Sequence, residues 1–319
     1  MIGPTKTSKG SRAWLPFLFL LMGFVLQPIG AVVAEDMAAP ARAPKLQQDE
    51  QGRVLVDVRV RGEGPFPFLL DTAASRTVMY RTLVSLLELE AVPFKSRRVM
   101  TATGAREMQL YRIGEFEALG KTLSVKETVA MPDPSVEGIS GILGIDLLRG
   151  HQMILDQTGA RLEDDRNLRR ESGWLDLKAR AVGYGSLAVT VVIEGVEIHA
   201  LVDTGSGKTV LNRPALEALE KALPGAITEG GASVSASGRA MAASVIEVPG
   251  LAVGTWQLPG QRLVSAHLPI FATFGASRAP AMILGMDVLL QADTVAMDFK
   301  RWRMMVRPRG EAAVQAGRP

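Results

Sequence analysis

An Asp-Thr pair directly follows an apolar segment twice in this chain, first at Asp71 and again roughly 130 residues later at Asp203. The first copy spans residues 68–75 (FLLDTAAS) and the second spans residues 200–206 (ALVDTGS). A carboxylate at the end of a buried strand is costly unless something pairs it or uses it. Two such carboxylates in duplicated surroundings therefore predict one shared site where both meet.

A second landmark is duplicated in the same order. Each Asp-Thr pair is followed about 70–80 residues later by an Ile-Leu-Gly triplet. The triplets are Ile142, Leu143 and Gly144 in the first half, and Ile283, Leu284 and Gly285 in the second half. Landmarks that recur in order at this spacing indicate a duplicated domain, because the period is too long for a solenoid unit.

The segments between these landmarks are typical of β structure. Residues 54–60 alternate valine with polar positions, as in a strand with one buried face, and Gly62 with Gly64-Pro65 predicts a turn. Short helices are expected at residues 82–89 and 214–223, the second with Pro214 near its first turn. Four aspartates also recur in pairs: we interpret Asp146 and Asp287 as helix-start residues, and Asp156 and Asp298 as turn residues.

The N-terminus has the layout of a targeting segment. Lys6, Lys9 and Arg12 precede an apolar run over residues 13–26, and small residues follow at 31–34. Because the run is short for a membrane span of roughly 20 residues, we expect a cleaved signal peptide and an exported protein, periplasmic or extracellular. The alternative is a retained N-terminal membrane anchor.

Charge and cysteine content exclude several function classes. Without the three cations of the targeting segment, the 36 lysines and arginines fall to 33, which balances the 33 Asp and Glu residues. The basic character needed for nucleic-acid binding is therefore absent from the mature chain. The chain has no cysteine, which excludes thiol catalysis, disulfides and cysteine metal sites. The three histidines are scattered and do not have metal-ligand spacing, so we expect no metal and no cofactor.

These features divide the chain into six parts. We assign residues 1–34 to the signal peptide, 35–52 to a flexible linker, 53–165 to a first lobe, 166–181 to an inter-lobe connection, 182–309 to a second lobe and 310–319 to a tail. The dense charge run at residues 161–171 is interpreted as a solvated connection.

The duplicated pattern resembles the retropepsin-like and pepsin-like aspartic proteases, in particular bacterial single-chain members, over most of residues 53–309. The resemblance implies a mainly β fold of two homologous acid-protease barrel lobes related by a pseudo-twofold axis. It implies that Asp71 and Asp203 are catalytic and that Thr72 and Thr204 hydrogen-bond across the lobes. It also implies that each Ile-Leu-Gly triplet packs behind its own catalytic loop.

The chemistry of such a pair follows from elementary electrostatics. Two carboxyl groups a few ångströms apart cannot both ionise cheaply, so they hold one proton between them. The ionised member can deprotonate a water that attacks a peptide carbonyl, while the protonated member donates to the carbonyl oxygen. We therefore expect an endopeptidase that acts on polypeptides as a monomer. The alternative is a catalytically silent protease-like module that binds peptides or proteins.

The first copy departs from the family pattern at one position. Ala73 stands where glycine is expected, whereas Gly205 is present in the second copy. Alanine resists positive φ and adds a methyl group where the two loops approach. If the backbone requires positive φ there, the first loop is strained or Asp71 is displaced. This departure keeps the silent module open as an alternative.

Two further patterns bear on function. Matching small-polar turns at residues 99–105 and 233–239 are candidate substrate-covering flaps, with Thr103, Gly104, Ser237 and Gly238 at their tips; the alternative is a pair of ordinary surface hairpins. Residues 205–209 (GSGKT) look like a phosphate-binding loop, but Val202 stands where that motif requires its first glycine. We therefore discount an ATPase.

Overall fold

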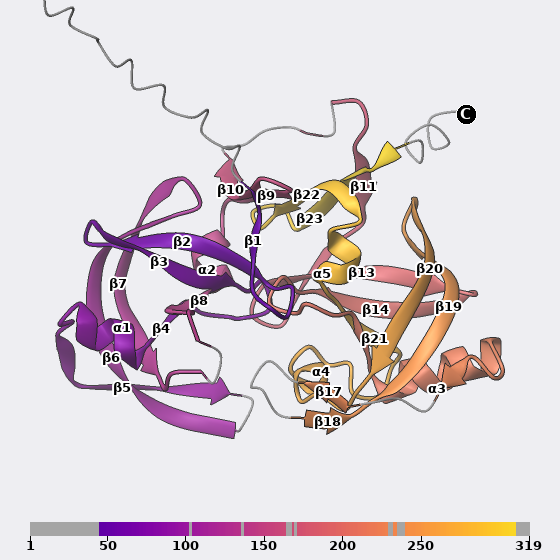
Figure 1. The fold of residues 1–319 in the computed structure, drawn as a ribbon, viewed down its shortest axis with the longest axis horizontal. Helices are drawn as coiled ribbons and strands as arrows, with labels where there is room; N and C mark the ends of the chain where they lie inside the picture. The colour runs from indigo at the N-terminus through magenta and orange to yellow at the C-terminus, as the bar shows by residue number, and fades with distance from the viewer. Residues whose placement is uncertain are drawn as a thin grey trace, which may run out of the picture. The chain divides into compact units, whose positions relative to one another are not determined.

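The computed structural model describes residues 45–101, 104–134, 137–163, 168, 171–228, 232–234 and 240–310. This part of the chain is mainly β and forms two barrels and a third sheet (Figure 1). The predicted signal peptide and most of the predicted tail lie outside the described residues. Within them, no helix is both long and apolar enough to cross a membrane.

The first barrel closes on itself through six strands. In spatial order these are β2 (Val54–Val60), β3 (Glu63–Leu70), β8 (Gly141–Leu143), β4 (Val78–Tyr80), β7 (Lys121–Met131) and β6 (Gly104–Ala118). Pairing of β6 with β2 completes the circle, while β1 (Gln47–Gln48) and β5 (Ala91–Thr101) extend the sheet. The predicted turn forms at residues 61–62 and so includes Gly62, but its predicted extension to Gly64-Pro65 is wrong, because both residues lie inside β3.

The second barrel repeats this order. Its six strands are β13 (Ser186–Ile193), β14 (Val196–Val202), β21 (Ala281–Leu284), β15 (Val210–Leu211), β20 (Trp256–Ser265) and β19 (Ser244–Val253), and β19 pairs with β13 to close it. β12 (Arg180–Val182) and β16 (Ile227–Thr228) extend the sheet, and β17 (Ala232–Val234) pairs separately with β18 (Ala240–Ala242). The predicted fold class, two homologous mainly β lobes, is confirmed.

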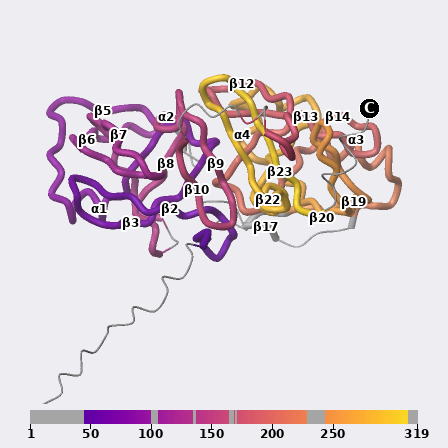
Figure 2. The backbone as a smooth tube through the Cα atoms, turned by 90° about the horizontal axis from the view of Figure 1, so that it is seen from above, coloured from indigo at the N-terminus to yellow at the C-terminus, as the bar shows by residue number. Residues whose placement is uncertain are grey.

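A third, five-stranded sheet contains strands from both halves of the chain. Its order is β10 (Gly159–Glu163), β9 (Gln152–Asp156), β22 (Ala292–Asp298), β23 (Arg303–Pro308) and β11 (Leu175–Leu177). β9 follows the first barrel and pairs antiparallel with β22, which follows the second, with Leu155 opposite Val295. Figure 2 shows β9 and β10 beside β22 and β23. This sheet therefore fixes one lobe against the other.

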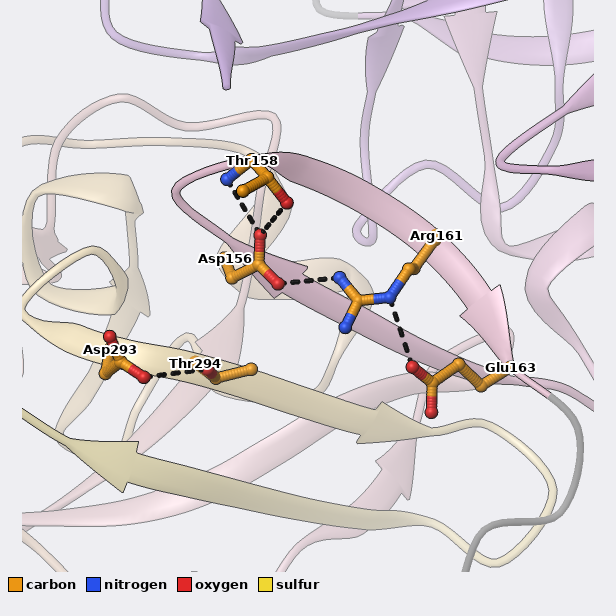
Figure 3. A network of polar contacts seen from close by, with 6 residues as sticks. All are labelled: Asp156, Thr158, Arg161, Glu163, Asp293 and Thr294. Carbon is orange, nitrogen blue, oxygen red and sulfur yellow. Dashed lines mark hydrogen bonds and ion pairs between the residues drawn. The ribbon is translucent and has the colours of Figure 1, made fainter. Parts of the chain in front are cut away.

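The hairpin from β9 to β10 is closed by a polar network. Asp156 accepts hydrogen bonds from the Thr158 amide and hydroxyl groups, at 2.8 and 2.5 Å, as a turn residue does. The Arg161 guanidinium then joins Asp156, at 2.6 Å, to Glu163, at 3.1 Å (Figure 3). Arg161 and Glu163 lie in β10, so the charge run begins in a strand and the interpretation of all of it as a solvated connection is wrong.

Five short helices cover the barrels at defined points: α1 (Arg81–Leu86), α2 (Ile145–Leu148), α3 (Arg213–Ala222), α4 (Ile270–Thr273) and α5 (Met286–Leu289). The longest, α3, begins one residue before its predicted start, because Asn212 caps it by accepting from the Ala215 amide at 2.9 Å. Its Ala215 and Leu219 side chains are fully buried. The core beneath is largely aliphatic, with an edge-to-face pair of Phe68 and Phe116 in the first barrel.

Candidate active site

The two aspartates occupy equivalent positions at the ends of β3 and β14. Each strand runs parallel to the strand of its own Ile-Leu-Gly triplet, so Leu70 pairs with Leu143 and Val202 pairs with Leu284. The Asp71 amide then donates to the Leu143 carbonyl at 3.0 Å, and the Asp203 amide donates to the Leu284 carbonyl at 3.1 Å. The triplets therefore hold the points at which both aspartates leave their strands.

The glycine of each triplet allows the aspartate loop to pass close behind it. A methyl group on Gly144 would lie 2.5 Å from the Arg76 carbonyl carbon, and one on Gly285 would lie 2.5 Å from the Lys208 carbonyl carbon. Real Cβ atoms do not approach backbone so closely. Any larger residue at Gly144 or Gly285 would displace the loop that carries Asp71 or Asp203.

A threonine six residues after each aspartate ties the loop to the helix that follows the triplet. The Thr77 amide and hydroxyl donate to Asp146 at 2.7 and 2.8 Å, and Thr77 Oγ1 accepts from the Gly144 amide at 3.0 Å. In the second lobe, Thr209 makes the same contacts with Asp287 and Gly285. The sequence reading missed both threonines, although their identical offset from the aspartates was a signal that could have found them.

Thr72 and Thr204 join the two loops at the centre of the molecule. Each hydroxyl donates across to the other lobe, Thr72 to the Val202 carbonyl at 2.8 Å and Thr204 to the Leu70 carbonyl at 2.7 Å. Each hydroxyl also accepts from the backbone amide of the opposite threonine, Thr72 Oγ1 at 3.1 Å and Thr204 Oγ1 at 3.2 Å. Both side chains are fully buried. The four reciprocal bonds hold the two Asp-Thr segments together.

The carboxyl groups of Asp71 and Asp203 lie next to each other beside this contact, and each influences the ionisation of the other. Asp71 Oδ1 accepts from the Ala73 and Ala74 amides, at 2.9 and 2.7 Å. Asp203 Oδ1 accepts from the Gly205 amide alone, at 2.8 Å, among the described backbone amides. The local hydrogen bonding is therefore asymmetric and stabilises negative charge better on Asp71.

Burial and mutual repulsion act on this pair in the same sense. Burial raises the pKa of both carboxyl groups above the ordinary aspartate value, and the nearby charge of Asp71 raises the pKa of Asp203 well above it. Backbone hydrogen bonds and the positive charge of Arg53 partly oppose this rise. The pKa of Asp203 is therefore raised further than that of Asp71, in agreement with the asymmetric backbone hydrogen bonding.

The structure explains why alanine replaces glycine in only one of the two loops. A methyl group on Gly205 would lie 2.5 Å from Asp71 Cγ, so glycine is required there for space. Ala73 does not have positive φ, so the anticipated backbone strain does not arise. Its methyl group instead packs with an apolar cluster of the second lobe that includes Leu201, Ile270 and Phe274.

The remaining predicted site residues divide into two groups. Gly104 opens β6 and pairs with Thr101 in the β5–β6 hairpin, as a flap would require. Thr103, Ser237 and Gly238 lie outside the described residues. The sequence did not indicate Arg53 or Tyr80 as neighbours of the pair. The positive charge of Arg53 partly offsets the rise that burial causes in the pKa of Asp71. Burial and the charge of Asp71 raise the pKa of the Tyr80 phenol. Among the described residues there is no cluster of three or more potential metal ligands.

Comparison with known proteins places this arrangement in context. The sequence model of a family described as aspartyl protease matches residues 56–147 and 189–288. No curated protein sequence matches the chain significantly. Among solved structures, the crystal structure of basic 7S globulin from soybean is similar at 12% sequence identity and a TM-score of 0.48, covering 85% of this chain and 97% of that one.

Proposed function

Because the chain belongs to the aspartyl protease family, we propose that it is an aspartic endopeptidase that hydrolyses peptide bonds with water activated between Asp71 and Asp203. The observation that carries the proposal is that reciprocal threonine hydrogen bonds bring together two carboxyl groups at the ends of duplicated strands, the half-buried Asp71 and the buried Asp203. Such a pair is costly to a fold and useful to hydrolysis.

The asymmetry of the pair assigns a role to each aspartate. The Asp71 carboxylate takes a proton from a water molecule as its oxygen attacks the peptide carbonyl carbon, and protonated Asp203 donates to the carbonyl oxygen. The product is a tetrahedral diol, with the proton of water now on Asp71. That proton then passes to the amide nitrogen, Asp203 regains a proton from a diol hydroxyl group, and the C–N bond breaks. The cycle needs no metal or covalent intermediate.

The rigid support of the pair favours this chemistry. The reciprocal threonine hydrogen bonds and the two glycine-backed loops hold the carboxyl groups in one geometry. Preorganised acid and base groups lower a reaction barrier because they need no rearrangement during the reaction. The catalytically silent binding module loses its main argument, since Ala73 does not strain the loop.

Cleavage of an unfolded polypeptide tests the proposal. We expect the wild type to cleave it, and Asp71→Asn and Asp203→Asn each to lower the rate by at least about 1,000-fold, since each removes one of two cooperating groups. Asp57→Asn is the matched control, because Asp57 is exposed in β2. Wild-type protein that binds polypeptides without cleaving them would support the silent module. Full activity in Asp71→Asn alone would indicate a homodimer that pairs two copies of Asp203.

We also propose that the protein is exported and works as a monomer on polypeptides. The basic and apolar pattern of residues 1–34 supports export, and the pairing of two lobes within one chain supports a monomer. Fractionation of producing cells, comparing the full chain with a variant lacking residues 1–34, tests export. Sedimentation of the active protein tests its oligomeric state.

A further inference from the structure

A buried ion pair closes the turn that precedes β2. Asp49 Oδ1 accepts from the Gln51 and Arg53 amides at 3.0 and 2.9 Å, and Asp49 Oδ2 accepts from Arg53 Nε at 2.7 Å and lies 2.5 Å from a second guanidinium nitrogen. The two side chains are only 6% and 5% exposed. Because a buried ion pair is costly unless its geometry is nearly complete, this pair fixes the shape of the turn.

The Asp49–Arg53 turn rests on the second lobe. A methyl group on Gly207 would lie 1.7 Å from the Gln51 carbonyl oxygen, so the two backbones are in direct contact. Gly207 does not have positive φ, and its lack of a side chain therefore provides space. Gly207 belongs to the loop that leaves Asp203, and the neighbouring Ser206 carbonyl accepts from the Met286 amide at 2.8 Å. The turn of one lobe thus supports the aspartate loop of the other.

Arg53 also acts on the carboxyl pair through its charge. It opposes the effect of burial on Asp71 and Asp203 and lowers the pKa of both, and it acts in the same sense on the Tyr80 phenol of β4. Asp49 faces Arg53 from its own turn, and Asp133 acts on Tyr80 in the opposite sense. The corresponding turn before β13 contains Gly183, Tyr184 and Gly185. That turn has no cation of its own, and the guanidinium of Arg149 donates to its Tyr184 carbonyl instead.

We propose that Arg53, held by Asp49, is a positioning residue of the catalytic pair: it braces the Asp203 loop through the contact of Gln51 with Gly207, and its charge acts on the pair from this turn. The inference rests on the proposed endopeptidase function. Arg53 makes two contributions that can be tested separately. The contact of Gln51 with Gly207 depends on the shape of the turn, and the effect on the carboxyl pair depends on the charge of Arg53.

The pH profile of kcat/KM on a fluorogenic peptide tests the contribution of charge. The double variant Asp49→Asn with Arg53→Met removes both charges without leaving a lone buried ion, and we expect its whole profile to move to higher pH. Arg53→Lys keeps the charge and should retain the wild-type position of the profile. Arg213→Met is the matched control, since it breaks an i,i+4 pair that is 84% and 55% exposed. An unmoved profile in the double variant, or an equal movement in Arg53→Lys, would overturn the contribution of charge.

The contact of the turn with Gly207 is tested by a change that leaves every charge in place. Gly207→Ala should lower kcat/KM by about tenfold or more without moving the pH profile, because it displaces the loop. The matched control Gly260→Ala should change little, because a methyl group there lies no closer than 3.3 Å to any neighbour. Equal activity in the two variants would overturn the bracing role.

A readout that needs no catalysis separates failure of this inference from failure of the proposed function. We expect the melting temperature of Asp203→Asn to differ from that of the protein without this substitution by an amount that changes with pH. A plot of this difference against pH reports the ionisation of the pair. We expect the difference curve to move to higher pH when Asp49 and Arg53 carry the double substitution. If no variant cleaves peptides and the curve still moves, the proposed function fails while the role of Arg53 stands. An unmoved curve counts against Arg53 whatever the activity.

Discussion

Gly205 faces Asp71 across the two lobes so closely that an added methyl group would lie 2.5 Å from the aspartate Cγ and 2.7 Å from Oδ2. The second-lobe loop therefore defines the position of the first-lobe carboxyl group. Conversely, Ala73 in the first loop carries a methyl group that contacts an apolar cluster of the second lobe. The pseudo-twofold relation of the lobes is thus broken at the two residues that directly follow the Asp-Thr pairs.

Gly205→Ala should abolish most activity while leaving the fold intact. The new methyl group would force the Asp71 carboxyl group away from Asp203, and a displacement of about 1 Å can cost about 100-fold in rate. The measurement is kcat/KM on a peptide substrate together with circular dichroism. Gly260→Ala serves as the control in an exposed part of β20. Activity within threefold of the wild type would show that the loops can separate without loss of function.

Removal of one threonine hydroxyl group should destabilise the protein. Thr72→Val and Thr204→Val each leave buried backbone groups without their partner, which typically costs about 1–3 kcal/mol in the free energy of unfolding. Because the two hydroxyl groups belong to one network, the double variant should lose less than the sum of the single losses. Denaturant unfolding measures all three variants, with Thr190→Val as the control, since Thr190 is exposed on β13. Strict additivity would contradict a shared network.

The general plan of the fold could be predicted from the sequence, because a duplicated pattern constrains both halves at once. The alternation of Val54 to Val60 and the capped helix near Pro214 are local signals, and both elements form as expected. Of the predicted turn at Gly62 and Gly64-Pro65, only the Gly62 part forms, because Gly64 and Pro65 lie within β3 at an irregularity in its pairing with β2, between the Val58–Phe66 and Val60–Glu63 pairs.

The supports of the site were less accessible to sequence reading. Thr77 and Thr209 hydrogen-bond to aspartates roughly 70–80 residues further along the chain, and only the folded structure shows these contacts. Their equal distance in sequence from Asp71 and Asp203 is the one signal that the sequence contains. Arg53 lies in a segment whose second-lobe counterpart contains no cation, so no repeat could signal it. The sequence pattern predicts a strained backbone at Ala73. In the structure Ala73 instead packs against an apolar cluster that includes Ile270 of α4, about 200 residues further along the chain, which no local pattern could indicate.

Asp203→Asn should stabilise the protein at neutral pH and have little effect in acid. The folded-state pKa of Asp203 is raised well above 3.8 by burial and by Asp71, so between these values the folded protein binds more protons than the unfolded chain. The free energy of unfolding therefore falls as pH rises through this window, and asparagine removes that loss. Thermal unfolding from pH 3.5 to 7.5 should give a melting-temperature difference that grows with pH.

The Asp156→Asn variant provides a control of opposite sign for that experiment. Burial alone would raise the pKa of Asp156, but the hydrogen bonds from Thr158 and Arg161 outweigh burial and lower it. Its stabilising contribution is therefore present at neutral pH and is lost as pH falls through the lowered pKa. Asp156→Asn should destabilise at pH 7 and approach the wild type in acid. Parallel pH profiles for the two variants would contradict the assigned directions.

Ala73→Gly restores the family pattern, and we expect it to bring no gain. The methyl group of Ala73 packs with Leu201, Ile270 and Phe274, and its loss should reduce the free energy of unfolding by about 1 kcal/mol from lost burial and added chain entropy. Because the Ala73 backbone has no positive φ, glycine relieves no strain, so kcat/KM should stay within about threefold of the wild type. Denaturant unfolding and peptide cleavage measure the two quantities on the same sample. A large increase in kcat/KM would mean that the methyl group of Ala73 impairs the carboxyl pair. That outcome would again support the alternative of a protease-like module with little or no catalytic activity.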